Sequence, residues 1–295
     1  MNRIKFAAAA VLMVAALLMA QCCVGEAVSL PIDLSGGLPY STENCVSETV
    51  YEDPSIRVEL SEDMVGVTRV HIARVKIADS SQLRTAPAYS FDRDQTAPMT
   101  SIAERVNAVI AINGDYYSYQ ALRGGYMIRQ GQLYIDNPIP GRDVLVIDGN
   151  GDFHTELEIT DEFVAKYDEL GGIINSFNFG PGLIVDYVKT DRFGGVFNTA
   201  QKKAARSCIC QVRSGALEYL LIVSEGTDDS YGGGLTLEEF TDYVSTFGVQ
   251  HAYNLDGGNS AALIYMNEKI NAANNRHHRP LSDIIYFAST AGAGE

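Results

Sequence analysis

The sequence predicts a single domain of the α+β class, with a mixed β-sheet core and a few helices. Three observations support this class. Short runs of alternating or continuous apolar residues recur along the chain, turns rich in glycine and asparagine separate them, and few segments show helical spacing. No linker-like stretch divides residues 56–290, so we expect one domain over that range.

The N-terminus has the layout of a secretory signal. Arg3 and Lys5 precede an apolar run over residues 6–20, and small residues follow. The run is short of the roughly 20 residues that a spanning helix needs. We therefore expect a signal peptide over residues 1–25 and a secreted or cell-envelope protein, with an uncleaved signal anchor as the alternative. Residues 26–55 are expected to form an extended N-terminal segment.

Charge and cysteine content narrow the class of protein. The net charge of −15 disfavours a nucleic-acid partner, because an acidic protein gains nothing from counterion release. Cys45, Cys208 and Cys210 remain after the signal. Cys208 and Cys210 have strand spacing and are expected to be small buried residues. A disulfide from Cys45 to one of them is left open.

The residue pattern in the first half of the chain predicts mainly β-hairpins. Residues 56–77 alternate and predict two paired strands, and residues 101–107 predict a short helix capped by Thr100. Residues 109–112 form a continuous apolar run, which is typical of a strand buried on both faces. Further strand pairs are predicted over 124–133 and 144–155.

The second half begins with a predicted helix over residues 161–170. A Gly-Pro turn at Gly180 leads into a strand, and the polar residues 188–203 suit a mobile surface loop or lid. Strands are predicted over 204–212, 217–223 and 284–288.

Residues 232–266 contain the most informative stretch. Thr236 and Glu239 have capping-box spacing, and an apolar stripe follows until Gly248 ends the helix. A strand over 252–255 then leads into Asp256-Gly257-Gly258, and another strand is expected over 261–265. A carboxylate at a strand end followed by two glycines suits close approach of a ligand, although a tight turn is the alternative.

The strand over 109–112 ends in a similar way. It leads into Asn113, Gly114 and Asp115, so a second buried strand delivers an amide and a carboxylate to its exit. A hairpin turn is again the alternative.

Four blocks of sequence stand in order along the chain: residues 111–117, 180–185, 205–207, and the helix with 254–260. Together they resemble the phosphodiester glycosidase family. The resemblance covers about residues 70–290, and a closing block at 279–283 also fits. Two departures stand out: Asp115 replaces a usual glycine, and Asn259 replaces a third glycine.

The resemblance implies hydrolysis of a sugar-1-phosphodiester, similar to an N-acetylglucosamine-1-phosphodiester, at the anomeric carbon. A phosphate leaving group is a weak base, so acid catalysis matters less than in an ordinary glycosidase. We expect Asp256 to be the carboxylate at the anomeric carbon and Arg206 to clamp the phosphate. Glu225 and Asp115 are further catalytic candidates.

The substrate is expected to be a glycan or sugar phosphate. Backbone N–H groups at 257–259 are candidates to hold an oxyanion. No cofactor is certain; a calcium ion held by Glu225, Asp228, Asp229 and Asp256 is left open, since no EF-hand spacing exists. Two rival functions are a non-catalytic carbohydrate-binding envelope protein and a metal-dependent phosphodiesterase. The substrate-binding candidates are Asn113, Gly114, Gly180, Asn254, Gly257, Gly258 and Ser260.

Overall fold

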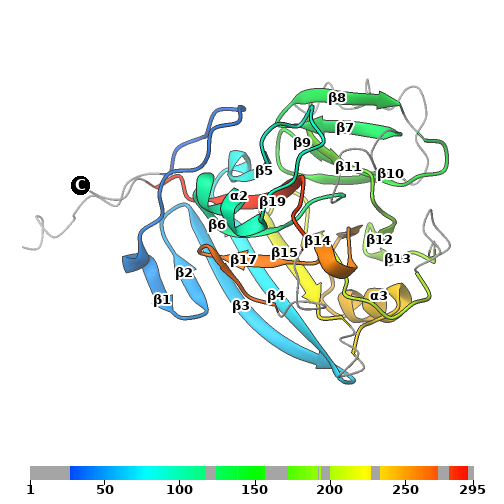
Figure 1. Ribbon diagram of the computed structural model, residues 1–295. Coiled ribbons are helices and arrows are strands. Elements are labelled where there is room, and N and C mark those ends of the chain that lie inside the picture. The colour runs from blue at the N-terminus through cyan, green and yellow to red at the C-terminus, as the bar shows by residue number, and fades with distance from the viewer. Residues whose placement is uncertain are drawn as a thin grey trace, which may run out of the picture.

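The computed structural model describes residues 27–116, 124–137, 139–156, 166, 172–191, 193, 200–226, 233–271 and 279–291. These residues form a mainly β structure with two α-helices, α2 and α3 (Figure 1). The α+β class therefore holds in its coarse form. The predicted mixed sheet does not, because all strand pairs within the described ranges are antiparallel, many of them hairpins between consecutive strands.

The largest sheet has nine strands in the order β1-β2-β3-β4-β15-β14-β16-β12-β13. Its longest pair, β3 and β4, is the hairpin predicted over 56–77, drawn in cyan in Figure 1. The strands span Cys45–Ser47, Val50–Glu52, Ile56–Val65, Thr68–Ile77, Glu218–Ser224, Ser207–Gln211, His251–Leu255, Gly182–Val185 and Val188–Lys189, in sheet order.

Three smaller sheets complete the described β structure. The five-stranded sheet has the order β18-β17-β6-β19-β5, spanning Glu268–Lys269, Leu263–Tyr265, Ala108–Asn113, Asp283–Ala288 and Leu83–Pro87. The three-stranded sheet has the order β10-β9-β11, spanning Phe153–Glu156, Val144–Asp148 and Ile173–Phe177. The two-stranded sheet pairs β7 (Gly125–Arg129) with β8 (Gln132–Asn137).

The main core lies between the nine-stranded and five-stranded sheets. Val75 and Leu221 contribute from the first sheet, Ile110 and Phe287 from the second, and Leu145 of β9 closes one end. Separate apolar clusters attach α2 to the outer face of the five-stranded sheet and α3 to the outer face of the nine-stranded sheet. Strand β6 is thus covered on both faces, which explains its continuous apolar sequence.

The helices follow their predicted signals to different degrees. Helix α3 (Leu237–Ser245) has the predicted capping box between Thr236 and Glu239, and Gly248 adopts φ +63° just beyond it. Helix α2 (Met99–Arg105) begins after Pro98, so the predicted Thr100 cap is wrong. The helix predicted over 161–170, apart from residue 166, and residues 192 and 194–199 of the loop predicted over 188–203 lie outside the described residues.

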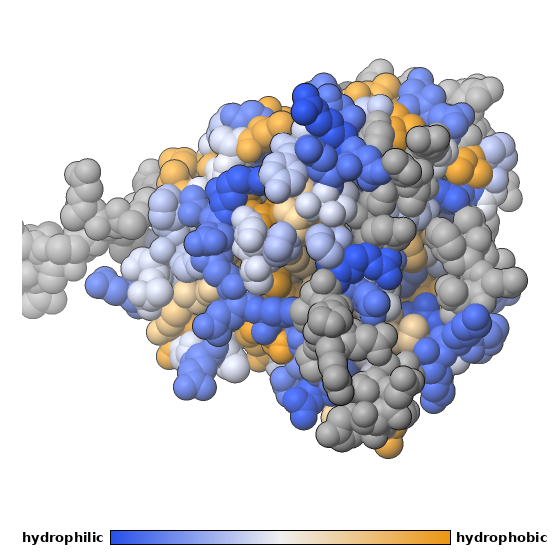
Figure 2. Space-filling model, viewed as in Figure 1, coloured by the Kyte–Doolittle hydropathy of each residue, from blue (hydrophilic) through white to orange (hydrophobic). Residues whose placement is uncertain are grey.

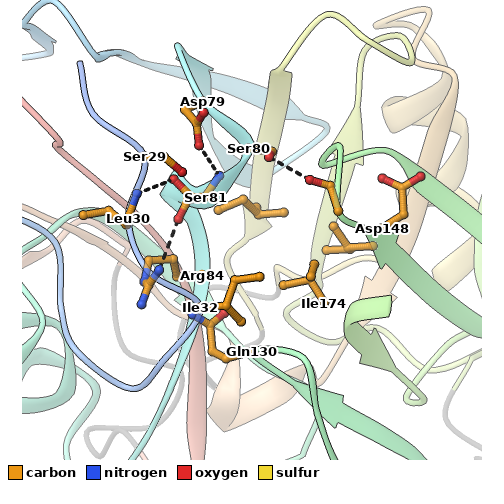
Figure 3. A pocket seen from close by; sticks show the side chains of 13 residues that line it. Ser29, Leu30, Ile32, Asp79, Ser80, Ser81, Arg84, Gln130, Asp148 and Ile174 are labelled. Carbon is orange, nitrogen blue, oxygen red and sulfur yellow. Dashed lines mark hydrogen bonds between the residues drawn. The ribbon is translucent and has the colours of Figure 1, made fainter. Parts of the chain in front are cut away.

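The N-terminal segment joins the sheets. Strands β1 and β2 extend the edge of the nine-stranded sheet, and buried Arg84 donates to the backbone carbonyls of Pro31, Asp33 and Ser35. A cavity of about 170 Å³ lies beside this segment (Figure 3). Its polar groups bond one another: the Leu30 N–H donates to Ser81 Oγ at 2.8 Å. The cavity is therefore lined by groups that hold the segment in place.

The surface is mostly polar. Figure 2 shows hydrophilic residues over much of one face, with hydrophobic residues scattered between them. Exposed large apolar side chains such as Val46, Val67 and Val188 occur on different strands or turns. Of the helices in the described ranges, none has the length and apolar character to cross a bilayer.

Candidate active site

Asp256 directly follows β16, an interior strand of the nine-stranded sheet, at the carboxyl end of that strand. The β14–β16 ladder ends with Ser207 opposite Leu255, so Arg206 and Asp256 occupy the next positions along their strands. The two glycines then let the chain turn tightly against β14. A Cβ at Gly257 would come within 2.7 Å of the Ala205 carbonyl oxygen, and Gly258 adopts φ +59°. Glycine is therefore favoured at 257 by close packing and at 258 by its left-handed backbone conformation.

The Gly258 N–H donates to the Ala205 carbonyl at 2.9 Å. This bond occupies the N–H that the sequence offered as an oxyanion donor, so that expectation is wrong for Gly258. The tight turn and the approach of the backbone to a ligand were alternatives in the sequence. The structure has the turn, and Asp256 is the residue that immediately precedes it.

Asn113 ends β6 and fixes the Asp256 backbone. Its Nδ2 donates to the Asp256 carbonyl at 2.7 Å, while its Oδ1 accepts from Ser207 Oγ at 2.8 Å and from the Ala262 N–H at 3.2 Å. The structure thus brings Asn113 and Asp256 together across 143 residues of chain. Because the amide is buried and bonded at both ends, it acts as a brace between the two sheets.

The Asp256 carboxylate is held in a partly dry environment. Burial raises the pKa of the Asp256 carboxyl from its ordinary value of 3.8 to about 6, while the charge of Arg279 opposes this rise. Its Oδ2 atom is buried and has no hydrogen-bond partner among the described residues. The Ser260 hydroxyl lies near enough to favour the ionised form, although its Oγ meets no partner in hydrogen-bond geometry. A carboxylate in this state can accept or donate a proton near neutral pH.

Asp115 lies in a fully buried ionic cluster. Its Oδ2 is 3.4 Å from Arg129 Nη2, and Arg129 Nε also donates to Asp283 at 3.0 Å. The Asp115 carboxylate accepts the backbone N–H groups of Asn178 and Phe179 at 2.7–2.9 Å. Burial raises the pKa of Asp115 against the opposing charge of Arg129. The structure therefore places this catalytic candidate behind the site, where it anchors the segment that enters the Gly180 turn.

Arg206 and Asp256 lie next to the last residue pair of the β14–β16 ladder, but the Arg206 side chain bonds backbone carbonyls of other segments. Nε donates to the Leu235 carbonyl at 3.0 Å, and Nη2 donates to the Lys202 carbonyl at 2.6 Å. Burial lowers the pKa of Arg206 to about 10. These contacts tie the segment before β14 to the residue before α3's N-cap. The guanidinium predicted to clamp a phosphate thus spends at least two of its nitrogens on backbone carbonyls.

Glu225 follows β15 and lies one strand away from β16, since β14 intervenes. Its Oε1 is 3.0 Å from His71 Nε2, and the other ring nitrogen of His71 is 3.2 Å from Glu62, at ion-pair distance but outside hydrogen-bond geometry. Burial lowers the pKa of Lys269 to about 8 against the charge of Glu225. Glu225 therefore belongs to a neighbouring polar cluster, with His71 and Glu62, at the carboxyl end of β15.

The remaining predicted residues surround the Asp256 turn. The Gly180 carbonyl accepts from Asn254 Nδ2 at 2.7 Å, and Gly180 adopts φ +64° before a cis bond to Pro181. Asn254 Oδ1 is buried without a partner. Gly114 packs against Asp283, where a Cβ would come within 2.1 Å of the carboxylate.

Sequence reasoning missed two side chains beside this turn. The Tyr116 hydroxyl accepts from Arg142 Nη1 at 2.9 Å, and the Tyr116 ring packs 5.1 Å from that of Phe179. Burial raises the pKa of Tyr116, and the nearby charges of Asp115 and Asp256 add to this rise. Tyr116 lay in a quoted motif, but Arg142 lies in a Gly-Arg-Asp turn with no signal of its own.

The calcium candidates and the cysteines are the remaining residues singled out in the sequence. Asp228 and Asp229, the candidate calcium ligands, are not among the described residues, and the described part of the chain gathers no group of three metal-ligating side chains. Cys208 and Cys210 are buried with their sulfurs 3.7 Å apart, and Cys45 contacts the sulfur of Met266 at 3.6 Å. All three are free thiols, so the disulfide left open by the sequence does not form.

Solved structures share this antiparallel fold. One is the catalytic domain of zebrafish N-acetylglucosamine-1-phosphodiester alpha-N-acetylglucosaminidase, auto-inhibited by its pro-peptide, with a TM-score of 0.62 at 15% identity over 86% of this chain and 87% of that one. A hypothetical protein from Synechocystis gives 0.54 at 17% identity, over 82% and 64% of the two chains. A putative exported protein from Burkholderia pseudomallei gives 0.53 at 13% identity, over 75% and 74%. These three structures define the fold class of this chain.

The family model for phosphodiester glycosidases matches residues 106–288, which is more than half of the chain. The chain therefore belongs to the phosphodiester glycosidase family, as the sequence blocks predicted. The curated proteins contain no sequence match to it.

Proposed function

We propose that this protein hydrolyses a sugar-1-phosphodiester of the N-acetylglucosamine-1-phosphodiester type at the anomeric carbon. Family membership supports the reaction class, and the name of the zebrafish structural relative supports the sugar. The observation that carries the proposal is the Asp256 carboxylate, with a pKa of about 6 and an unpartnered oxygen, braced by Asn113 at the end of a buried strand.

Water supplies the hydroxyl in this reaction. The bond between the anomeric carbon and the phosphate oxygen breaks, and its electron pair leaves with the phosphate monoester. The second proton of water passes to Asp256 or to solvent. The charge of the Asp256 carboxylate stabilises the positive charge that develops on the sugar ring. A preorganised carboxylate does this best, which gives the Asn113 brace a functional reason.

Arg206 has a different proposed role from the one its sequence suggested. Because its Nε and Nη2 hold the Leu235 and Lys202 carbonyls, we propose that it fixes the segment that borders Asp256. Replacement by alanine would then lower both stability and activity, whereas a phosphate clamp would lose affinity for the anion with the fold intact.

The test is hydrolysis of the methyl diester of N-acetylglucosamine-1-phosphate in water labelled with heavy oxygen. We expect free N-acetylglucosamine carrying the label, unlabelled methyl phosphate, and loss of turnover in Asp256→Asn. Label in the phosphate would instead identify a phosphodiesterase. Glycan binding without turnover, unaffected by Asp256→Asn, would identify a carbohydrate-binding protein. Either outcome refutes the proposal. Parallel reactions with calcium and with a chelator decide the metal requirement.

We also propose that residues 1–25 direct export. The basic start, short apolar run and small residues that follow it support this assignment, and a structural relative from Burkholderia pseudomallei carries the name putative exported protein. N-terminal sequencing of the protein from an expressing cell tests it: a mature chain that begins near residue 26 is expected, and an intact N-terminus in the membrane fraction would indicate an anchor.

A further inference from the structure

Arg142 is a buried cation without an anionic partner among the described residues. It lies on the turn before β9 and is 8% exposed. Nη1 donates to the Tyr116 hydroxyl at 2.9 Å and weakly to the Gly124 carbonyl at 3.4 Å, and Nε is buried without a partner. No carboxylate among the described residues forms an ion pair with it, whereas buried Arg84 pairs with Asp33.

Burial of an unpaired guanidinium costs several kcal/mol, so native structures rarely retain one without a use. Buried Arg129 also has anionic partners, because it forms ion pairs with two carboxylates. Among the described residues, Arg142 therefore lacks the carboxylate partner that Arg84 and Arg129 have. A further buried arginine, Arg206, donates to backbone carbonyls from Nε and Nη2, whereas Arg142 has a buried Nε without a hydrogen bond. A bound anion would supply the negative charge that Arg142 lacks.

The free edge of the Arg142 guanidinium suits a phosphate. Nη1 is engaged by Tyr116, while Nε and Nη2 form no hydrogen bond within the described residues. These two nitrogens lie on the same side of the planar group and present parallel N–H bonds. That arrangement grips two oxygens of one phosphate.

The neighbours of Arg142 connect it to the segments that carry Asp256. Tyr116 ends the segment that begins at Asn113, and Asn113 Nδ2 bonds the Asp256 carbonyl at 2.7 Å. The next residue, Asp143, accepts at its backbone carbonyl from the Tyr253 hydroxyl at 2.8 Å. Tyr253 lies on β16, three residues before Asp256, which follows that strand. The effect of the Asp256 charge on the Tyr116 hydroxyl agrees with this proximity.

We propose that Arg142, held in place by Tyr116, binds the phosphate group of the substrate. The site then takes sugars that carry an anionic phosphodiester and disfavours neutral glycosides. The identity of the sugar rests on the proposed function, but the anion site follows from Arg142 itself. The fold assigns the phosphate cation to Arg142, a residue outside every sequence motif quoted for the family.

The test measures binding of methyl phosphate, the expected product, to the full chain by calorimetry. We expect Arg142→Gln to weaken binding by about 10- to 100-fold, because a charge-assisted contact is lost. Tyr116→Phe should weaken it less, and Arg142→Lys should lie between. Arg213→Gln, an exposed change at the far end of β14, is the matched control. Binding of neutral N-acetylglucosamine should be unchanged in Arg142→Gln.

Unchanged methyl phosphate binding in Arg142→Gln, or no binding by the unmodified protein, would overturn the inference. If Arg142→Gln does not fold, Arg142→Lys and Tyr116→Phe decide by the same criterion. Binding that depends on Arg142 without any hydrolysis of the diester would retain the anion site and reject the proposed function. If Arg142→Gln hydrolyses the diester with an unchanged KM, the proposed function is retained and the anion site at Arg142 is rejected.

Discussion

Asp256→Asn should make the protein more stable at neutral pH while it removes activity. A rise of the Asp256 pKa from 3.8 to about 6 corresponds to about 3 kcal/mol of free energy that disfavours the ionised folded state. The residue keeps some contact with solvent, so we expect about 1–2 kcal/mol in practice. A residue that lowers stability in this way is typical of a functional site.

The sign of the pH dependence follows from the two pKa values. The folded state binds the Asp256 proton more tightly than the unfolded state does. The unmodified protein therefore loses stability as the pH rises from about 4 to about 6, relative to Asp256→Asn. Above pH 7 the difference should be constant, at about 2–8 °C in the unfolding temperature.

The assay is thermal unfolding of both proteins at pH 4, 5, 6 and 7.5, with Asp136→Asn as a control at an exposed position of β8. The control should shift the midpoint little at any pH. A difference between Asp256→Asn and the unmodified protein that stays flat from pH 4 to 7.5, or favours the aspartate at high pH, would refute the assignment of a dry, poorly partnered carboxylate.

Two further predictions concern the supports of the site. Arg129→Met leaves Asp115 and Asp283 buried without their shared cation, so unfolding by urea should show a loss of about 3–5 kcal/mol that shrinks at acidic pH; a loss below 1 kcal/mol would contradict the buried ion cluster. Gly257→Ala forces a methyl group against the Ala205 carbonyl at 2.7 Å, so we expect about 1–3 kcal/mol of destabilisation and a fall in kcat; wild-type stability and turnover would show that the turn is looser than described.

The sequence alone predicted most local elements and the family. Alternation over residues 56–77 gave the long hairpin, and the capping box at Thr236 gave α3, because both signals are contained within a few residues. The motifs also indicated that Asn113 and Asp256 follow buried strands. Elements were misplaced where the signal was weak, as at the start of α2, where Pro98 precedes the first turn.

Tertiary structure decided which way the functional side chains point and what they contact. Asp115 pairs with Arg129, Arg206 bonds the Leu235 carbonyl, and Arg142 meets Tyr116 across 26 residues of chain. Periodicity tells which face of a strand a residue occupies, but the partner that satisfies a buried charge comes from another element folded against it. Motif residues could therefore be located from sequence, whereas their protonation, their donors and the unpaired arginine beside them required the packed sheets.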